Sequence, residues 1–210
     1  MASSGQSSDH SPGDRSLAVH ERLRTEADEA RVPVEWAGGP GSEPVLASLV
    51  LASAADPGSR DQAAFAVEAV LEGFLCHQGR ARLFGPADGD VALLAGDLLY
   101  ALGLRAVASA GETDSVVVLA DLIGAAAGLA AEGRIGALAA LWTAQAVALG
   151  DDPDGVPERL LTELTDGSDP DGALFLEAAS ARALAIGADG ALNRALDALQ
   201  SLFEVPTGTR

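Results

Sequence analysis

Glycine and proline interrupt this sequence at short intervals, and the segments between them are apolar and rich in alanine and leucine. Alanine is the best helix former, and the aromatic side chains that strands favour make up only 4% of the chain. No segment alternates apolar and polar residues as a half-buried strand does. Four glycines follow long apolar segments and mark expected helix ends: Gly111, Gly133, Gly150 and Gly187. The sequence therefore predicts an all-α, single-domain helical bundle of about nine helices.

The predicted helical domain spans residues 15–205. Residues 1–14 are rich in serine, glycine and aspartate, which predicts a disordered polar tail, and residues 206–210 form a second, short tail. Within the domain, prolines and glycines concentrated in residues 32–41 predict a break between helices. Four polar residues stand where a helix is expected to begin: Ser42, Asp90, Asp114 and Asp189.

The charged residues exclude several functions. All thirteen basic residues are arginines, so Schiff-base chemistry on a lysine is excluded. The net charge of −18 disfavours nucleic acid and anionic membrane surfaces as partners, because these carry negative charge themselves.

Three features bear on the compartment. Cys76 is the single cysteine, so no disulfide within the chain is expected. Met1–Gly13 lacks the apolar stretch of a signal peptide. The most apolar segment, Val91–Leu104, is interrupted by Asp97 and is expected to be too short to span a bilayer. Together these features predict a cytoplasmic protein with no membrane span.

Five sequence elements follow one another in an order that is typical of one enzyme family. They are Gly38-Gly39-Pro40-Gly41-Ser42-Glu43-Pro44, the pair Glu68 and His77, Ala92-Leu93-Leu94-Ala95-Gly96-Asp97-Leu98-Leu99, Gly172-Ala173-Leu174-Phe175, and the segment Ala191–Val205. In this order they resemble the polyprenyl diphosphate synthase family, which includes geranylgeranyl and farnesyl diphosphate synthases. The resemblance covers residues 16–205 and implies the isoprenoid (prenyl) synthase fold.

The residues that do the chemistry in that family are replaced. Its members hold three magnesium ions between two aspartate-rich clusters, because clustered carboxylates are needed to bind such cations. The second cluster is expected after Val205, where Pro206–Arg210 follows. The first is expected after His77, where the sequence reads Gln78, Gly79, Arg80, Ala81 and Arg82. The resemblance therefore implies a chain with no catalytic residues, no metal and no cofactor.

The basic residues that bind diphosphate in the family are missing as well. Pro40, Gly41 and Glu43 stand in place of a lysine and two arginines. Pro170-Asp171 stands in place of a Lys-Thr pair, and Gly133-Arg134 in place of Gly-Gln or Gly-Glu. An active synthase is thus the least favoured function.

Two functions follow from this comparison, and the sequence leaves both open. The first is a non-catalytic subunit, of the small or regulatory type, that partners or regulates an active polyprenyl synthase in isoprenoid biosynthesis. The second is a helical interaction or scaffold protein that keeps no link to isoprenoids. Either function predicts a homo- or hetero-oligomer that does not bind nucleic acid.

Five residues are singled out within the apolar segments 91–110 and 114–132, which resemble the helices through which the family forms dimers. Asp97 is the one charge in its apolar run, and we expect it to be a buried structural acid rather than the remnant of a substrate site. Glycines allow helix backbones to approach closely, so four glycines are candidate interface residues: Gly96, Gly103, Gly124 and Gly128.

Glu68 and Glu72 are four residues apart and therefore share one face of a helix. Paired carboxylates of this kind serve acid–base chemistry or bind a metal in some proteins. More often they belong to a solvated face, and here we expect that face, with Arg80 or Arg82 neutralising the charge.

Overall fold

The computed structural model describes residues 12–30, 35–37, 43–54, 60–85, 88–151 and 158–204. Within these residues the chain forms nine α-helices and no strand, which confirms the predicted all-α class. They are α1 (Pro12–Glu29), α2 (Leu46–Ser53), α3 (Asp61–His77), α4 (Gly89–Ser109), α5 (Thr113–Ala131), α6 (Ile135–Asp151), α7 (Glu158–Thr165), α8 (Ala173–Ile186) and α9 (Asp189–Glu204).

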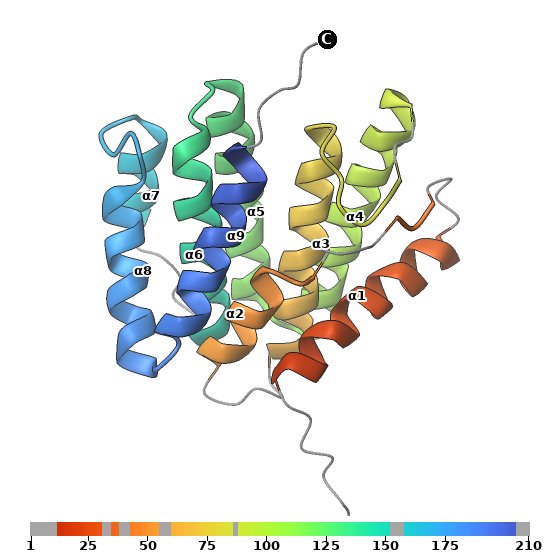
Figure 1. Cartoon of the computed structure of the whole chain (residues 1–210), viewed down its shortest axis with the longest axis horizontal. Coiled ribbons are helices and arrows are strands. Elements are labelled where there is room, and N and C mark those ends of the chain that lie inside the picture. The colour runs from red at the N-terminus through yellow and green to blue at the C-terminus, as the bar shows by residue number, and fades with distance from the viewer. Residues whose placement is uncertain are drawn as a thin grey trace, which may run out of the picture.

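Two helices form the buried centre of the bundle (Figure 1). Every residue of α6 from Ala137 to Gly150 is buried, and so is every residue of α3 from Ala63 to Cys76. Helices α2, α5, α8 and α9 pack against α6, while α1, α2 and α4 pack against α3. A helix such as α6, which is apolar on nearly all sides, is stable only when neighbours cover it all round.

Glycines set the contact between α3 and α4. A Cβ atom added to Gly103 of α4 would lie 2.8 Å from the carbonyl oxygen of Ala66, and one added to Gly96 would lie 2.9 Å from that of Gly73. Because both distances are shorter than real Cβ contacts, only glycine permits this approach of the two backbones. Gly96 and Gly103 therefore belong to packing inside the chain.

Glycine ends three of the four helices at which a glycine stop was predicted. Gly111, Gly133 and Gly187 have φ angles of 78°, 72° and 76°, in the left-handed region that glycine tolerates best. Gly150 lies inside α6, and the prediction of a stop there is wrong. A Cβ atom at Gly150 would lie 2.5 Å from the carbonyl oxygen of Val50, so this glycine allows α2 to approach α6.

The helix starts predicted at Asp90, Asp114 and Asp189 are correct to within two residues, whereas α2 begins at Leu46, four residues after the expected cap Ser42. Asp88 caps α4, because its side chain accepts a hydrogen bond from the Val91 N–H at 2.9 Å, whereas the expected cap Asp90 lies in the first turn. Asp114 and Asp189 likewise lie in the first turns of α5 and α9.

Several predictions fall on residues outside the described part of the chain. These include the tails 1–11 and 206–210, most of the break at 32–41, and the expected cap Ser42. At the N-terminal side, α1 begins at Pro12 and so includes the end of the predicted tail 1–14.

Helix α4 is longer than the apolar segment Val91–Leu104, which the sequence indicated to be too short to span a bilayer. Helices α4 and α5 have 21 and 19 residues, and by length and composition alone each is long and apolar enough to cross a membrane. In the fold, 39% of the most apolar part of α4 and 33% of that of α5 are buried. Core helices of soluble proteins meet the same criterion, so it assigns no location.

A matched pair of glycine substitutions tests the packing of α4 on α3. We expect Gly103→Ala to lower the free energy of unfolding by about 1–3 kcal/mol, because the new methyl group overlaps the α3 backbone. Gly124→Ala, in an open position on α5, should instead raise it by up to about 1 kcal/mol, because alanine is the better helix former. Urea unfolding followed by circular dichroism measures both. Equal effects of the two substitutions would show that α4 does not pack as described.

Candidate functional site

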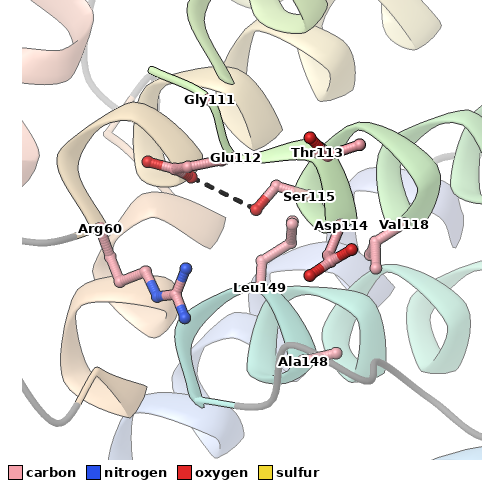
Figure 2. Close-up of a pocket in the computed structure, with 9 residues that line it drawn as sticks. All are labelled: Arg60, Gly111, Glu112, Thr113, Asp114, Ser115, Val118, Ala148 and Leu149. Carbon is pink, nitrogen blue, oxygen red and sulfur yellow. Dashed lines mark hydrogen bonds between the residues drawn. The ribbon is translucent and has the colours of Figure 1, made fainter. Parts of the chain in front are cut away.

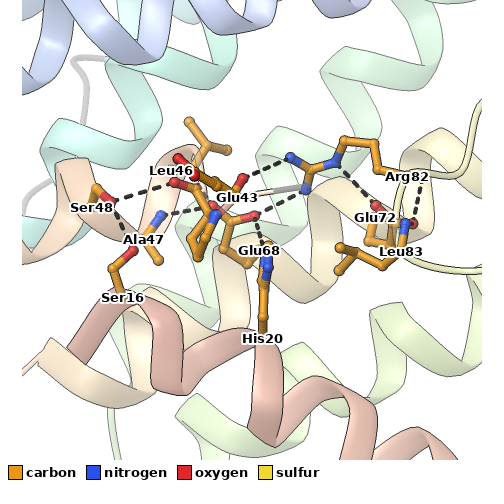
Figure 3. A network of polar contacts seen from close by, with 11 residues as sticks. Ser16, His20, Glu43, Leu46, Ala47, Ser48, Glu68, Glu72, Arg82 and Leu83 are labelled. Carbon is orange, nitrogen blue, oxygen red and sulfur yellow. Dashed lines mark hydrogen bonds and ion pairs between the residues drawn. The ribbon is translucent and has the colours of Figure 1, made fainter. Parts of the chain in front are cut away.

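The loop after α3, residues 78–85, takes the place that the family resemblance assigns to the first metal-binding cluster. Arg82 of this loop points into the protein, and its side chain is 5% exposed. Its Nη2 lies 3.1 Å from Glu68 Oε2 and its Nε lies 3.2 Å from Glu72 Oε2 (Figure 3). Both glutamates are completely buried, so one arginine neutralises two carboxylates inside the core.

Glu68 also completes the start of α2. Its Oε1 accepts hydrogen bonds from the backbone N–H groups of Leu46 and Ala47, at 2.5 Å and 2.9 Å (Figure 3). The residue before α2, Val45, offers no side-chain cap. A carboxylate from α3 therefore does the work of an N-cap for α2, and it also meets the positive end of that helix dipole.

Glu72 fixes the loop after α3. Its Oε1 accepts hydrogen bonds from the backbone N–H groups of Arg82 and Leu83, at 2.8 Å and 2.7 Å. Together with the Arg82 ion pair, these bonds hold the loop against the side of α3.

Helix α1 joins the same network through His20. The Nε2 atom of His20 lies 3.8 Å from Glu68 Oε2, a distance that fits an ion-pair contact but not a hydrogen bond. Nearby, the hydroxyls of Ser16 and Ser48 are hydrogen bonded at 2.7 Å, which ties α1 to α2. The network thus spans α1, α2, α3 and the loop.

The charges of this network stabilise one another against the cost of burial. Burial by itself would raise the pKa of Glu68, but the His20 side chain, the Arg82 guanidinium and the Ala47 N–H outweigh it and lower that pKa to about 2. Burial also disfavours the charge on Arg82, yet Glu68 and Glu72 overcome it and raise the pKa of Arg82. Glu68 and Arg82 are therefore charged at neutral pH.

These contacts correct the prediction made for the two glutamates. Glu68 and Glu72 do not form a solvated face, although Arg82 does neutralise them as expected. Because Arg82 and backbone N–H groups occupy their oxygens, the pair is neither an acid–base couple nor a metal site. Among the described residues, no three histidine, cysteine, aspartate or glutamate side chains gather as a metal site would require.

The prediction that Asp97 is a buried structural acid is wrong. Its side chain is 70% exposed, and its Oδ1 lies 3.2 Å from His77 Nε2. The His77 ring stacks on Tyr100 with a centroid distance of 5.2 Å. Asp97 lies on an exposed part of α4, next to His77 at the C-terminal end of α3, which explains why an acid is tolerated in so apolar a helix.

Cys76 is no candidate nucleophile. Burial, with a further contribution from the charge of Glu72, raises the pKa of the Cys76 thiol to about 12. Its reactive thiolate form is therefore negligible at neutral pH.

Arg80, the other arginine of the loop, reaches the last turn of α9. Its guanidinium donates hydrogen bonds to the carbonyl oxygens of Leu202 and Phe203, the latter at 3.2 Å. These carbonyl oxygens have no hydrogen-bond donor within the helix, and they lie at the negative end of the helix dipole. The guanidinium supplies both the donors and a positive charge. The Phe203 ring also meets Phe74 of α3 edge-on, with centroids 6.1 Å apart. The end of α3 and the end of α9 are therefore in direct contact.

A second contact joins Arg134, just before α6, to the turn before α8. The Arg134 guanidinium donates hydrogen bonds to the carbonyl oxygens of Asp169 and Pro170, at 3.0 Å and 3.2 Å. Figure 1 places the turn between α5 and α6, which carries Arg134, at the same end of the bundle as the ends of α3 and α9. The Asp169 side chain in turn caps α8, accepting a hydrogen bond from the Ala173 N–H at 2.8 Å.

A shallow pocket of about 320 Å³ lies at the opposite end of α3 (Figure 2). Arg60 lines one side, and Glu112 and Asp114 at the start of α5 line another. Arg60 Nε donates to the Gly150 carbonyl oxygen at 3.2 Å, and the Ser115 hydroxyl donates to Glu112 at 3.3 Å. Among the described residues that line it there is no histidine or cysteine, and their charges have mixed signs, so the pocket favours no particular ligand.

The outward sides of α4 and α5 together form a surface that we call the α4–α5 face. Its residues are exposed and mostly small or apolar: Leu93, Leu94, Asp97, Ala101, Arg105 and Ala108 on α4, and Val117, Ala120, Asp121, Gly124, Ala127, Gly128 and Ala131 on α5. Gly124 and Gly128 have no neighbouring atom where a Cβ would stand. Of the four candidate interface glycines, only these two are on the surface, because Gly96 and Gly103 are buried against α3.

Comparisons with models of protein families, with curated proteins and with solved structures gave no match to this chain.

The charge of Glu68 has a testable signature in the pH dependence of stability. We expect Glu68→Gln to lower the free energy of unfolding by about 3 kcal/mol at neutral pH, because Arg82 and the start of α2 lose a buried anion. Since the folded pKa of Glu68 is below its ordinary value of 4.5, its contribution is complete above pH 4.5 and is lost as the pH falls toward about 2.

The difference between the wild type and Glu68→Gln should therefore shrink below pH 4.5, as urea titrations at several pH values would show. Glu177→Gln, at an exposed glutamate of α8, serves as the control and should change stability little. A difference that stays constant down to about pH 3 would mean that Glu68 is not a stabilised anion.

Proposed function

We propose that this chain is a non-catalytic subunit with the isoprenoid synthase fold, and that it partners or regulates an active polyprenyl diphosphate synthase. The observation that carries the proposal is the contact of Arg80 with the last carbonyls of α9. The family resemblance assigns its two metal-binding clusters to the residues after His77 and after Val205. The chain segments that lead into these two positions lie against each other.

The second contact supports the proposal in the same way. Arg134 stands where the resemblance expects Gly-Gln or Gly-Glu, and Pro170 stands where it expects the lysine of the Lys-Thr pair. In the family both positions serve the diphosphate sites, and here they are joined by a hydrogen bond. Segments distant in sequence are thus neighbours in the way that a shared ancestral site requires.

The replacements at these positions also explain why the chain would act by binding. An active site of this family attracts magnesium and two diphosphates with carboxylates and basic side chains. Arg80, Arg82 and Arg134 are instead committed to carbonyl and carboxylate oxygens of the protein itself. In this proposal the chain keeps the helical fold without the ligand-binding side chains, and the fold serves contacts with other proteins.

An add-back assay tests the proposal. A polyprenyl synthase with both aspartate-rich clusters, taken from the same cell, is assayed with and without an equimolar amount of this chain. We expect the added chain to co-purify with the synthase and to change its rate or the length of its product. An unrelated helical protein of similar net charge is the control, because it reproduces any effect of acidity alone.

If the chain neither binds that synthase nor changes its products, the subunit function fails. The alternative, a helical interaction protein with no link to isoprenoids, would then be favoured.

A further inference from the structure

We propose that a groove between α1, α3 and α4 binds a small organic carboxylate, whose charged end lies between Arg22 and Arg105 and whose apolar body lies along α1. The groove is beside the first turns of α3, whereas the loop that the family resemblance assigns to metal follows the last turn of that helix. This inference goes beyond the proposed function and does not depend on it.

Two adjoining cavities, of about 280 Å³ and about 320 Å³, make up the groove. Both are lined by Arg22 of α1 and Gln62 of α3. The first is also lined by Arg15 and Ala18 of α1, and the second by Arg105 of α4. One elongated ligand that passes Arg22 can therefore occupy both cavities.

The groove is locally positive, although the whole chain carries a net charge of −18. Among the described residues that line it, three arginines stand against two carboxylates, which leaves a net charge of +1: Arg15, Arg22 and Arg105 against Asp61 and Glu26. A positive groove attracts small anions and repels metal cations. The local charge therefore selects an anionic ligand.

Glu26 already holds the two central arginines around a carboxylate. Its Oε1 accepts a hydrogen bond from Arg22 Nε at 2.7 Å, and its Oε2 accepts one from Arg105 Nη2 at 2.9 Å. Guanidinium groups bind carboxylates strongly because both partners are charged and their geometries match. One carboxylate between two guanidinium groups leaves one positive charge, which a second carboxylate can neutralise.

The Arg22 guanidinium is ordered before any ligand binds. Its Cζ lies 3.7 Å from the centroid of the Phe65 ring, and its Nη1 donates a hydrogen bond to Gln62 Oε1 at 2.9 Å. Phe65 is completely buried, so its ring is a rigid support for the cation. A side chain that is already ordered loses little conformational entropy on binding.

The same residues have N–H groups to offer a ligand. A guanidinium carries five N–H groups, of which these contacts use two in Arg22 and one in Arg105. Gln62 uses its oxygen for Arg22, and its amide nitrogen carries two further N–H donors. A carboxylate has two acceptor oxygens, so it can bind to donors on more than one of these side chains.

The charge and the walls of the groove favour an organic monocarboxylate over phosphate. A monoanion neutralises the net charge of +1, whereas a phosphate dianion adds a further negative charge close to Asp61 and Glu26. Apolar side chains form part of the wall of the first cavity: Ala18, Val19 and Phe65. A carbon chain can cover that apolar surface, and inorganic phosphate cannot.

A titration with hexanoate tests the inference. The full chain, labelled with ¹⁵N, is followed by NMR as sodium hexanoate is added at constant ionic strength. We expect saturable shifts of the side-chain Nε–H signals of Arg22 and Arg105. Hexanamide, which has the same body without the charge, and inorganic phosphate should each bind at least about tenfold more weakly, because the charge-assisted bonds or the apolar contacts are lost.

Three variants locate the site. Arg105→Gln should weaken hexanoate binding by at least about tenfold, because it removes a charged donor. Glu26→Gln should strengthen binding several-fold, because it removes the carboxylate that competes for both arginines. A damaged fold cannot produce such a gain. Arg194→Gln, at an exposed arginine of α9, is the matched control and should leave binding unchanged. Circular dichroism confirms that each variant keeps its helices.

Three outcomes would overturn the inference: no saturable shift at Arg22 and Arg105, phosphate or hexanamide binding as tightly as hexanoate, or a Glu26→Gln variant that binds no more tightly than the wild type. None of these results bears on the add-back assay, so failure of this inference and failure of the proposed function are distinguished.

Discussion

The buried ion pairs of Arg82 with Glu68 and Glu72 are the interaction on which much of this fold depends. Burying three charges is costly, and the cost is offset only because nearly every oxygen and N–H involved has a partner. The contacts reach four parts of the chain: Glu68 caps α2 and approaches His20 of α1, while Glu72 holds the loop after α3. Loss of one member would leave the others buried without compensation.

The same loop carries the replacements by which, under the proposed function, the chain differs from an active polyprenyl diphosphate synthase. Its two arginines extend to different neighbours, Arg82 to the glutamates of α3 and Arg80 to the end of α9. The loop is itself positively charged and is bound to the protein through these two arginines. Local electrostatics therefore favour a structural connection between α3 and α9 at the place where the resemblance expects metal chemistry.

Local features of the fold were predictable from the sequence. Helix ends such as Gly111 and Gly133 follow from the backbone preference of glycine, which depends on a few neighbouring residues. Gly150 shows the limit of that argument, because its role is to let α2 approach α6, and the sequence near Gly150 contains no sign of α2.

The candidate site was harder to predict, because burial of a charge depends on distant partners. The spacing of Glu68 and Glu72 is the same on a solvated helix as on a buried one. The sequence also does not show that the backbone N–H groups at the start of α2 need an acceptor from another helix. Conversely, the apolar neighbours of Asp97 suggested burial, but α4 is covered on one side only. In both cases the arrangement of helices decided the outcome.

Binding of magnesium and diphosphate tests most directly whether the loop after α3 serves the protein rather than a metal. Ligands that bind the folded state raise its melting temperature by mass action. Thermal unfolding of the full chain is followed with and without millimolar magnesium and pyrophosphate. These contacts predict an unchanged melting temperature, because Arg80 and Arg82 occupy this region and the glutamates are already paired. A rise of several degrees that requires both ligands together would contradict it.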